Sequence, residues 1–294
     1  MSTGKEAPLP VVPGAISACS SEHILNLDIS IKQAAFMKKT IFFLLIIISI
    51  TANAQQAKRK KAIIVLTYDD GLTSQLNVAI PQLDSANLTA TFFLTGNMTE
   101  TSLPRWRQAG KKGYELANHT LYHPCLLNIK ANPADNSANY TPYIMVREIK
   151  EMNTLLFALD GKTGGRTYAY PCTELEVGGV DYVDTLRKAG LAKYARIGGG
   201  PDAVITDFKK LDPLKVPSWG VPGNQVTGAA LIDFVKKVQQ SRGLGVFMFH
   251  GVGGDYLVTP ADAHRQLLKY LSQHRNEIEV TTFIKAMDEV MAAR

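Results

Sequence analysis

The stretch AIIVLTYDDG, residues 62–71, sets the architecture of this chain. An unbroken apolar run rich in Ile and Val is typical of a strand buried on both faces of a parallel sheet. The run ends on two adjacent carboxylates, Asp69 and Asp70. Two like charges side by side are unfavourable unless a cation or hydrogen bonds compensate them. The stretch therefore predicts a buried strand with a cation-binding or catalytic site at its carboxyl end.

Short apolar runs alternate with longer amphipathic stretches from residue 62 onward. This alternation is typical of β-α units around a parallel sheet, and seven or eight such units favour a barrel over an open sheet. The expected strands are 62–68, 89–93, 114–117, 167–170, 193–196, 216–219, 245–249 and 279–281. The expected helices are 74–85, 102–112, 143–159, 180–189, 227–241, 260–274 and 282–293.

The region before this alternation resembles a targeting segment. Residues 37–54 combine two lysines, an apolar stretch and the small residues Ala52-Asn53-Ala54, in the order of a secretory signal peptide. The apolar stretch is shorter than the roughly 20 residues of a membrane span, which disfavours the alternative of an uncleaved anchor. Residues 1–36 are interpreted as a non-native upstream extension, or otherwise as a disordered one. We expect one catalytic domain, 55–294, exported to the periplasm or beyond without stable membrane insertion.

The charge pattern argues against a nucleic-acid partner. The chain has 32 basic and 26 acidic residues, a net charge of +6, and its basic residues form one short run at 58–61. A nucleic-acid footprint would need a basic face with aromatic residues or a known binding motif, and the sequence offers neither. The oligomeric state stays open.

Two histidines four residues apart, His119 and His123, supply the most informative motif after the paired carboxylates. Together with Asp70 they form a three-ligand set suited to a divalent ion, and Asp69 is left free to act on a water molecule. The alternatives are a surface or hydrogen-bonded histidine pair, and an Asp69 that caps a following helix.

His250 ends the apolar strand 245–249 and precedes a glycine-rich loop. An ionisable group that emerges from a buried strand is well placed to act as a general acid, although a core histidine is the alternative. His264 and His274 fall on a helix that we expect at the surface, so we assign them no role.

Four strings in this order resemble the motifs of the polysaccharide deacetylases, carbohydrate esterase family 4. They are TYDDG at 67–71, HTLYH at 119–123, YAYP at 168–171 and FMFH at 247–250. The resemblance covers residues 62–290. It implies a distorted (β/α)7 barrel and a divalent metal, usually zinc, held by one aspartate and two histidines.

Carried onto this sequence, the resemblance implies a role for each motif residue. Asp69 would be the general base, Asp70, His119 and His123 the metal ligands, and His250 the general acid. The oxyanion donor would be the backbone N–H of Cys172. The implied activity is removal of acetyl groups from a carbohydrate, most simply the N-acetylglucosamine units of chitin oligomers, peptidoglycan or exopolysaccharide. An O-acetyl esterase of the xylan type and a catalytically silent, metal-containing glycan-binding protein are the alternatives.

The sequence departs from the family pattern at three places. Ala169 stands where the family has an arginine that orients the base, so either Arg196 reaches in from the next strand or the base is held differently. Cys172 replaces an aromatic residue. The fourth motif is not recognisable, and Trp219 near its place is either a wall of the sugar pocket or a core residue. Tyr170 and Tyr122 are further candidates for sugar stacking.

Cys125 and Cys172 are the cysteines outside the leader and its upstream extension. Cys125 follows His123 by two residues, and Cys172 belongs to the segment assigned to the same pocket. An exported protein permits a disulfide. We therefore hypothesise that the two cysteines pair, with two free thiols as the alternative.

Overall fold

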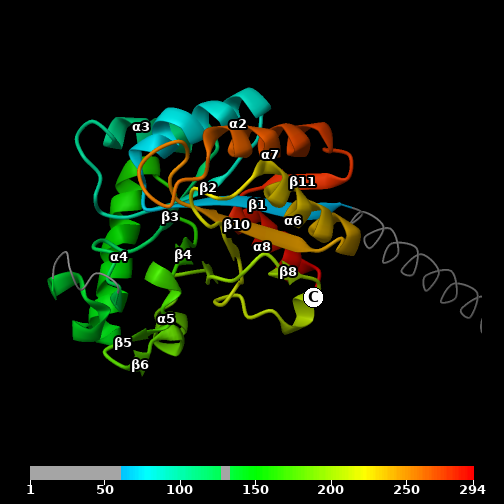
Figure 1. Ribbon diagram of the computed structural model, residues 1–294. Coiled ribbons are helices and arrows are strands. Elements are labelled where there is room, and N and C mark those ends of the chain that lie inside the picture. Colours follow the sequence, from blue (N-terminus) through cyan, green and yellow to red (C-terminus); the bar gives the residue numbers. More distant parts are fainter. Residues whose placement is uncertain (1–60, 127–132) are drawn as a thin grey trace, which may run out of the picture. The chain divides into compact units, whose positions relative to one another are not determined.

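The computed structural model describes residues 61–126 and 133–294, so the expected upstream extension, the signal peptide and all but Lys61 of the basic run lie outside the described residues. In this described part, nine strands form one sheet (Figure 1). Its members are β1 (Ala62–Asp69), β2 (Thr91–Leu94), β3 (Glu115–Asn118), β4 (Thr167–Ala169), β7 (Tyr194–Arg196), β8 (Val204–Ile205), β9 (Trp219–Gly220), β10 (Leu244–Phe249) and β11 (Ile278–Thr281).

Strand β1 is the centre of the sheet, and all eight of its residues are buried. It runs parallel to three strands: β10 along its length, β11 beside its first half and β2 beside its last residues. Burial of both faces of β1 explains why the sequence is apolar at successive positions rather than at alternate ones.

The sheet curls until its ends meet. The order β7-β4-β3-β2-β1-β10 is closed by the segment 216–220, because Val216 bridges Arg196 of β7 and the following β9 pairs with β10. With this segment counted as one strand, seven parallel strands surround an interior. The expected distorted (β/α)7 barrel is confirmed. Two further strands pair with its members: β8 with the start of β10, and β11 with the first half of β1.

The two faces of β1 pack against different partners. Ile63 and Val65 point into the barrel interior, where they meet side chains of helix α8 (Phe283–Ala292) such as Phe283 and Met287. Ile64, Leu66 and Tyr68 point outward against the surrounding helices. Because side chains alternate along a strand, Asp69 belongs to the interior face.

The outer helices are α2 (Ile80–Ala86), α3 (Leu103–Lys111), α4 (Pro142–Asp160), α5 (Val183–Ala189), α6 (Gly228–Ser241) and α7 (Ala261–Gln273). Figure 1 shows α2, α3 and α7 over one face of the sheet. Helix α4 begins where the Thr141 side chain accepts a hydrogen bond from the Ile144 N–H, and it ends at Gly161, which has a left-handed φ of 67°. Among the described helices, none has both the length and the apolar character that a bilayer span requires.

The observed elements differ from the predicted ones in two places that matter below. The expected helix 180–189 starts only at Val183, because β5 (Glu176–Val177) and β6 (Val180–Asp181) form an antiparallel hairpin. The expected helix 74–85 begins as a π-helical turn, η1 (Gln75–Ala79). Such turns are rare and occur often at functional sites.

Candidate metal and catalytic centre

The two carboxylates at the end of β1 are directed apart by the backbone. Asp69 is 2% exposed and faces the barrel interior. The next residue, Asp70, has a φ of 78°, a left-handed conformation that turns the chain out of the strand. Adjacent residues thereby take different roles: one carboxylate is buried, and the other lies at the mouth of the barrel with a side chain that is 10% exposed.

Asp69 is paired with Arg196, whose Nη2 lies 2.5 Å from Asp69 Oδ2. Burial raises the pKa of Asp69, but the charges of Arg196, His119 and His250, together with the Arg196 hydrogen bond, outweigh burial and leave the pKa lowered. Asp69 Oδ1 accepts no hydrogen bond from a described residue. The carboxylate is therefore kept ionised through one oxygen, while the other is buried without a hydrogen bond from a described residue.

The structure answers how Asp69 is held without an arginine at position 169. Ala169 of β4 and Arg196 of β7 are register partners on neighbouring parallel strands. Both belong to the interior face, where Ala169 packs in the core beneath the site. The small Ala169 side chain leaves the interior free for the guanidinium of Arg196, which also lies 5.0 Å from the Phe93 ring centroid.

The two motif histidines lie on a loop, not a helix. His119 follows β3, and the chain then turns at Thr120 (φ 67°) and His123 (φ 50°). The Asn118 side chain accepts a hydrogen bond from the Thr120 N–H, and Thr120 Oγ1 accepts one from the His123 N–H. These local bonds replace helical ones and bring the two imidazole rings to a centroid separation of 4.6 Å.

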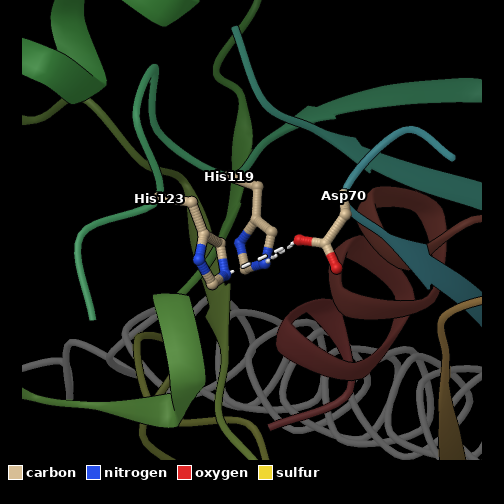
Figure 2. Close-up of side chains that lie close together, drawn as sticks. All are labelled: Asp70, His119 and His123. Carbon is tan, nitrogen blue, oxygen red and sulfur yellow. Dashed lines mark ion pairs between the residues drawn. The ribbon is translucent and has the colours of Figure 1, made fainter. Parts of the chain in front are cut away.

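Asp70, His119 and His123 converge on one point (Figure 2). Asp70 Oδ1 lies 3.5 Å from His119 Nε2 and 3.6 Å from His123 Nε2. A tetrahedral ion with ligand bonds of about 2.0–2.2 Å separates its ligand atoms by about 3.3–3.6 Å. The donor set and its spacing therefore fit a divalent ion such as zinc.

The hydrogen bond behind His119 fixes which of its nitrogens faces this point. Nδ1 lies 2.8 Å from the Ala169 carbonyl oxygen, which can only accept, so Nδ1 carries the proton. In the neutral ring Nε2 then keeps its lone pair for a metal. For His123, burial and the neighbouring His119 lower the pKa to about 4, which also favours the neutral, ligating form.

His250 lies on the other side of Asp70, with its Nε2 3.8 Å from Asp70 Oδ2. Its backbone is held by Gln75, a buried residue that the sequence analysis did not single out. The Gln75 amide donates to the carbonyl oxygens of Asp69, at 2.5 Å, and His250, at 3.1 Å. Gln75 thus joins the ends of β1 and β10. The only sign of this role in the sequence was a polar residue near the start of the expected helix 74–85.

Tyr256 is a second residue that the sequence analysis missed. Its hydroxyl donates to Asp70 Oδ2 at 2.6 Å, while half of the residue is exposed. Burial, with the adjacent Asp70 charge, raises the pKa of this phenol, so it stays a donor. The only sign of this contact in the sequence was the position of Tyr256 in the glycine-rich loop after His250.

Cys125 and Cys172 form a disulfide, which confirms the hypothesised pairing. It links the loop of His123 to the turn after β4, where Cys172 has a φ of 49°. Within the described residues, the Cys172 N–H donates to no acceptor. The role of this N–H as the oxyanion donor, which the resemblance implies, stays a prediction.

Three expectations are corrected by burial. Trp219 does not wall a sugar pocket, because it is 5% exposed and packs against Phe234 and Phe247 in the core. Tyr170 has no face for sugar stacking, because it is 2% exposed among Tyr168 and other core residues. His264, expected at the surface, is fully buried. Tyr122, by contrast, is 61% exposed beside the ligand loop.

Several solved structures share this fold. One is the crystal structure of a protein from Mycobacterium smegmatis that is named a putative polysaccharide deacetylase. It superposes with a TM-score of 0.59 at 16% identity, covering 79% of this chain and 91% of that one. The Xyl-CE4 domain of a multidomain xylanase from the hindgut metagenome of Trinervitermes trinervoides gives 0.53 at 16% identity, covering 78% and 91%. The peptidoglycan deacetylase PdaC from Bacillus subtilis gives 0.51 at 18% identity, covering 80% and 93%.

Sequence comparison agrees with the motifs. A bifunctional xylanase/deacetylase from Pseudobutyrivibrio xylanivorans is 30% identical over 90 residues, which are 30% of this chain and 15% of the length of that relative. Residues 56–192 match the family described as polysaccharide deacetylase, and this segment contains the paired carboxylates and both loop histidines. Motifs, fold and family match agree that residues 56–192 match a polysaccharide deacetylase domain.

Proposed function

We propose that this chain is an exported hydrolase that uses one divalent ion, Zn²⁺, to remove N-acetyl groups from N-acetylglucosamine units of a glycan. The observation that carries the proposal is the convergence of Asp70, His119 and His123 next to an ionised Asp69 whose second oxygen accepts no hydrogen bond from a described residue. The site combines a metal-ligand set with acid and base groups, which a protein that only binds glycans would not need.

Three side chains would hold the metal. Asp70 Oδ1 and the Nε2 atoms of His119 and His123 would hold the ion and leave positions open for water and substrate. A divalent ion at this site supplies Lewis-acid polarisation of the acetyl carbonyl. The remaining chemistry falls to side chains that flank the set.

Asp69 has the properties of the general base. Arg196 occupies Oδ2 and keeps the carboxylate charged, while Oδ1, which accepts no hydrogen bond from a described residue, would take a proton from the attacking water. Asp69 Oδ2 also lies 3.8 Å from His119 Nε2, so the base stands directly beside the ligands.

His250, on the opposite flank, is the proposed general acid. Its ring lies at the Oδ2 side of Asp70, and Gln75 fixes the strand end from which it emerges. An amine is a poor leaving group until its nitrogen is protonated, so a positioned acid suits amide cleavage more than ester cleavage. The free Cys172 N–H is the proposed donor to the oxyanion.

Export and the glycan are parts of the same proposal. The leader at 37–54 and the cysteine pairing both suit an oxidising compartment. A structural relative named as a peptidoglycan deacetylase motivates peptidoglycan as one test substrate. The relatives named for xylanase domains motivate acetylated xylan as another.

The test is acetate release by the purified protein from N-acetylglucosamine oligomers, peptidoglycan and acetylated xylan, with zinc and with a chelator. We expect release from the N-acetylated substrates that chelator abolishes. Asp69→Asn should lower turnover at least about 100-fold because the proposed proton acceptor is lost, while the zinc content of the protein is unchanged.

Two outcomes would contradict the proposal. Near-full turnover by Asp69→Asn would remove Asp69 as the base. Release from acetylated xylan alone would replace the amidase by an O-acetyl esterase with the same centre.

A further inference from the structure

The loop that follows His250 is closed by its own backbone. The Gly251 N–H donates to the Tyr256 carbonyl at 3.1 Å, and the Thr259 N–H donates to the Gly251 carbonyl at 2.8 Å. A Cβ atom at Gly251 would lie 2.1 Å from the Gly254 oxygen, so the closed loop requires glycine there. The backbone of Tyr256 therefore has a set position.

The same loop is fastened to the turn that carries Asp70. The Ser74 N–H donates to Asp255 Oδ2 at 2.7 Å, and the Val252 N–H donates to Ser74 Oγ at 3.1 Å. Two hydrogen bonds in opposite directions thus join the turn after β1 to the loop after β10. These bonds, whose acceptors are the Asp255 and Ser74 side chains, hold Tyr256 and Asp70 relative to one another independently of the contact between their own side chains.

The two carboxylate oxygens of Asp70 face different partners, and the Tyr256 hydroxyl contacts only one of them. It donates to Oδ2 at 2.6 Å, whereas Oδ1 faces His119 at 3.5 Å and His123 at 3.6 Å. A carboxylate with one oxygen engaged by a hydrogen bond is restricted in rotation about its Cβ–Cγ bond. It also presents one oxygen, rather than both, to an ion between the histidines.

We propose that Tyr256 is a positioning residue for the metal ligand Asp70, and that it makes Asp70 a one-oxygen ligand. This inference rests on the proposed function, because it presupposes an ion at the three-ligand set. Loss of the hydroxyl would free Oδ2 to rotate or to bind the ion as well. Metal affinity and coordination number should then both change.

The test compares wild type with Tyr256→Phe, which removes only the hydroxyl. The full chain is stripped of metal with a chelator and titrated with Zn²⁺ against a competing chromophoric chelator. We expect Tyr256→Phe to bind Zn²⁺ about tenfold more weakly, at the lower end of the usual 10–100-fold effect because Tyr256 is half exposed. Tyr143→Phe, a 73% exposed tyrosine on α4, is the control and should match wild type.

A second measurement separates positioning from general stability. The visible spectrum of the Co²⁺-substituted protein reports coordination number, and Tyr256→Phe should shift and weaken its bands if Oδ2 joins the ion. The thermal midpoint of the metal-free protein should be the same for Tyr256→Phe and Tyr143→Phe.

The outcomes are distinct for the two proposals. Tyr256→Phe with wild-type affinity and an unchanged Co²⁺ spectrum would overturn the role of Tyr256 and leave the proposed function standing. A wild-type chain that binds neither Zn²⁺ nor Co²⁺ would overturn the proposed function, and the inference with it.

Discussion

The buried imidazole of His264 should make this protein sensitive to acid. His264 lies on α7 with Nε2 2.6 Å from the Tyr68 hydroxyl and Nδ1 2.6 Å from Gln82 Oε1. The Gln82 oxygen can only accept, so Nδ1 carries the proton and Nε2 accepts from Tyr68. A second proton on Nε2 would face a hydroxyl that already donates to that nitrogen. The ring is therefore held neutral inside the core.

The size of the effect follows from the pKa. Burial lowers the pKa of His264 from its ordinary 6.5 to about 3. Between these values the unfolded chain binds a proton that the folded chain does not, so the free energy of unfolding decreases as the pH falls below 6.5. From pH 7 to pH 5 this one residue should remove about 2 kcal/mol of stability.

The assay is urea unfolding at pH 7 and pH 5 for the chelator-treated wild type and for His264→Gln, which cannot take up a proton. Other titrating groups are common to both proteins and cancel in the difference. We expect the stability advantage of wild type over His264→Gln to shrink by about 2 kcal/mol at pH 5. His274→Gln, at the partly exposed end of the same helix, is the matched control for loss of an imidazole. If the wild-type and His264→Gln curves keep the same separation at both pH values, the reasoning is refuted.

Two further substitutions test how the site is held. Arg196→Ala should lower the free energy of unfolding in urea by about 3 kcal/mol, because it leaves the buried Asp69 charge unpaired. Adding Ala169→Arg should recover part of the lost stability and turnover, because position 169 faces the same interior. A double variant no better than Arg196→Ala alone would argue against this reasoning. Replacing Cys125 and Cys172 by serine should lower stability by about 3–4 kcal/mol, given the 47-residue separation that the disulfide spans, and an unchanged urea midpoint would contradict it.

The fold could be predicted largely because its signal is local. The apolar run before Asp69 needs no knowledge of its neighbours to be assigned as a buried strand, and β1 is observed at Ala62–Asp69. The short hairpin of β5 and β6 was missed because two-residue strands carry no periodicity. His264 was misplaced although its signal was present: with Leu267, Leu268 and Leu271 it stands on the apolar stripe of α7, at spacings of three, four and seven.

The site was less predictable because part of it depends on which strands become neighbours. The proposed ligands Asp70, His119 and His123 each follow a strand, so parallel topology alone brings them to one end of the barrel. The contact of Tyr256 with Asp70 depends instead on the closed path of a glycine-rich loop. Loop conformation of that kind has no repeating sequence pattern from which it could be read.

Arg196 shows what the site requires of the sequence. Asp69, the proposed base, needs a guanidinium beside it in the barrel interior, and two register partners, Ala169 and Arg196, both point there. A parallel pair presents equivalent positions on adjacent strands, so the charge can come from either strand if the other supplies a small side chain. The missing arginine of the third motif therefore does not signal a lost base. It indicates that the same electrostatic need is met from β7, with the barrel closure through Val216 holding that strand in place.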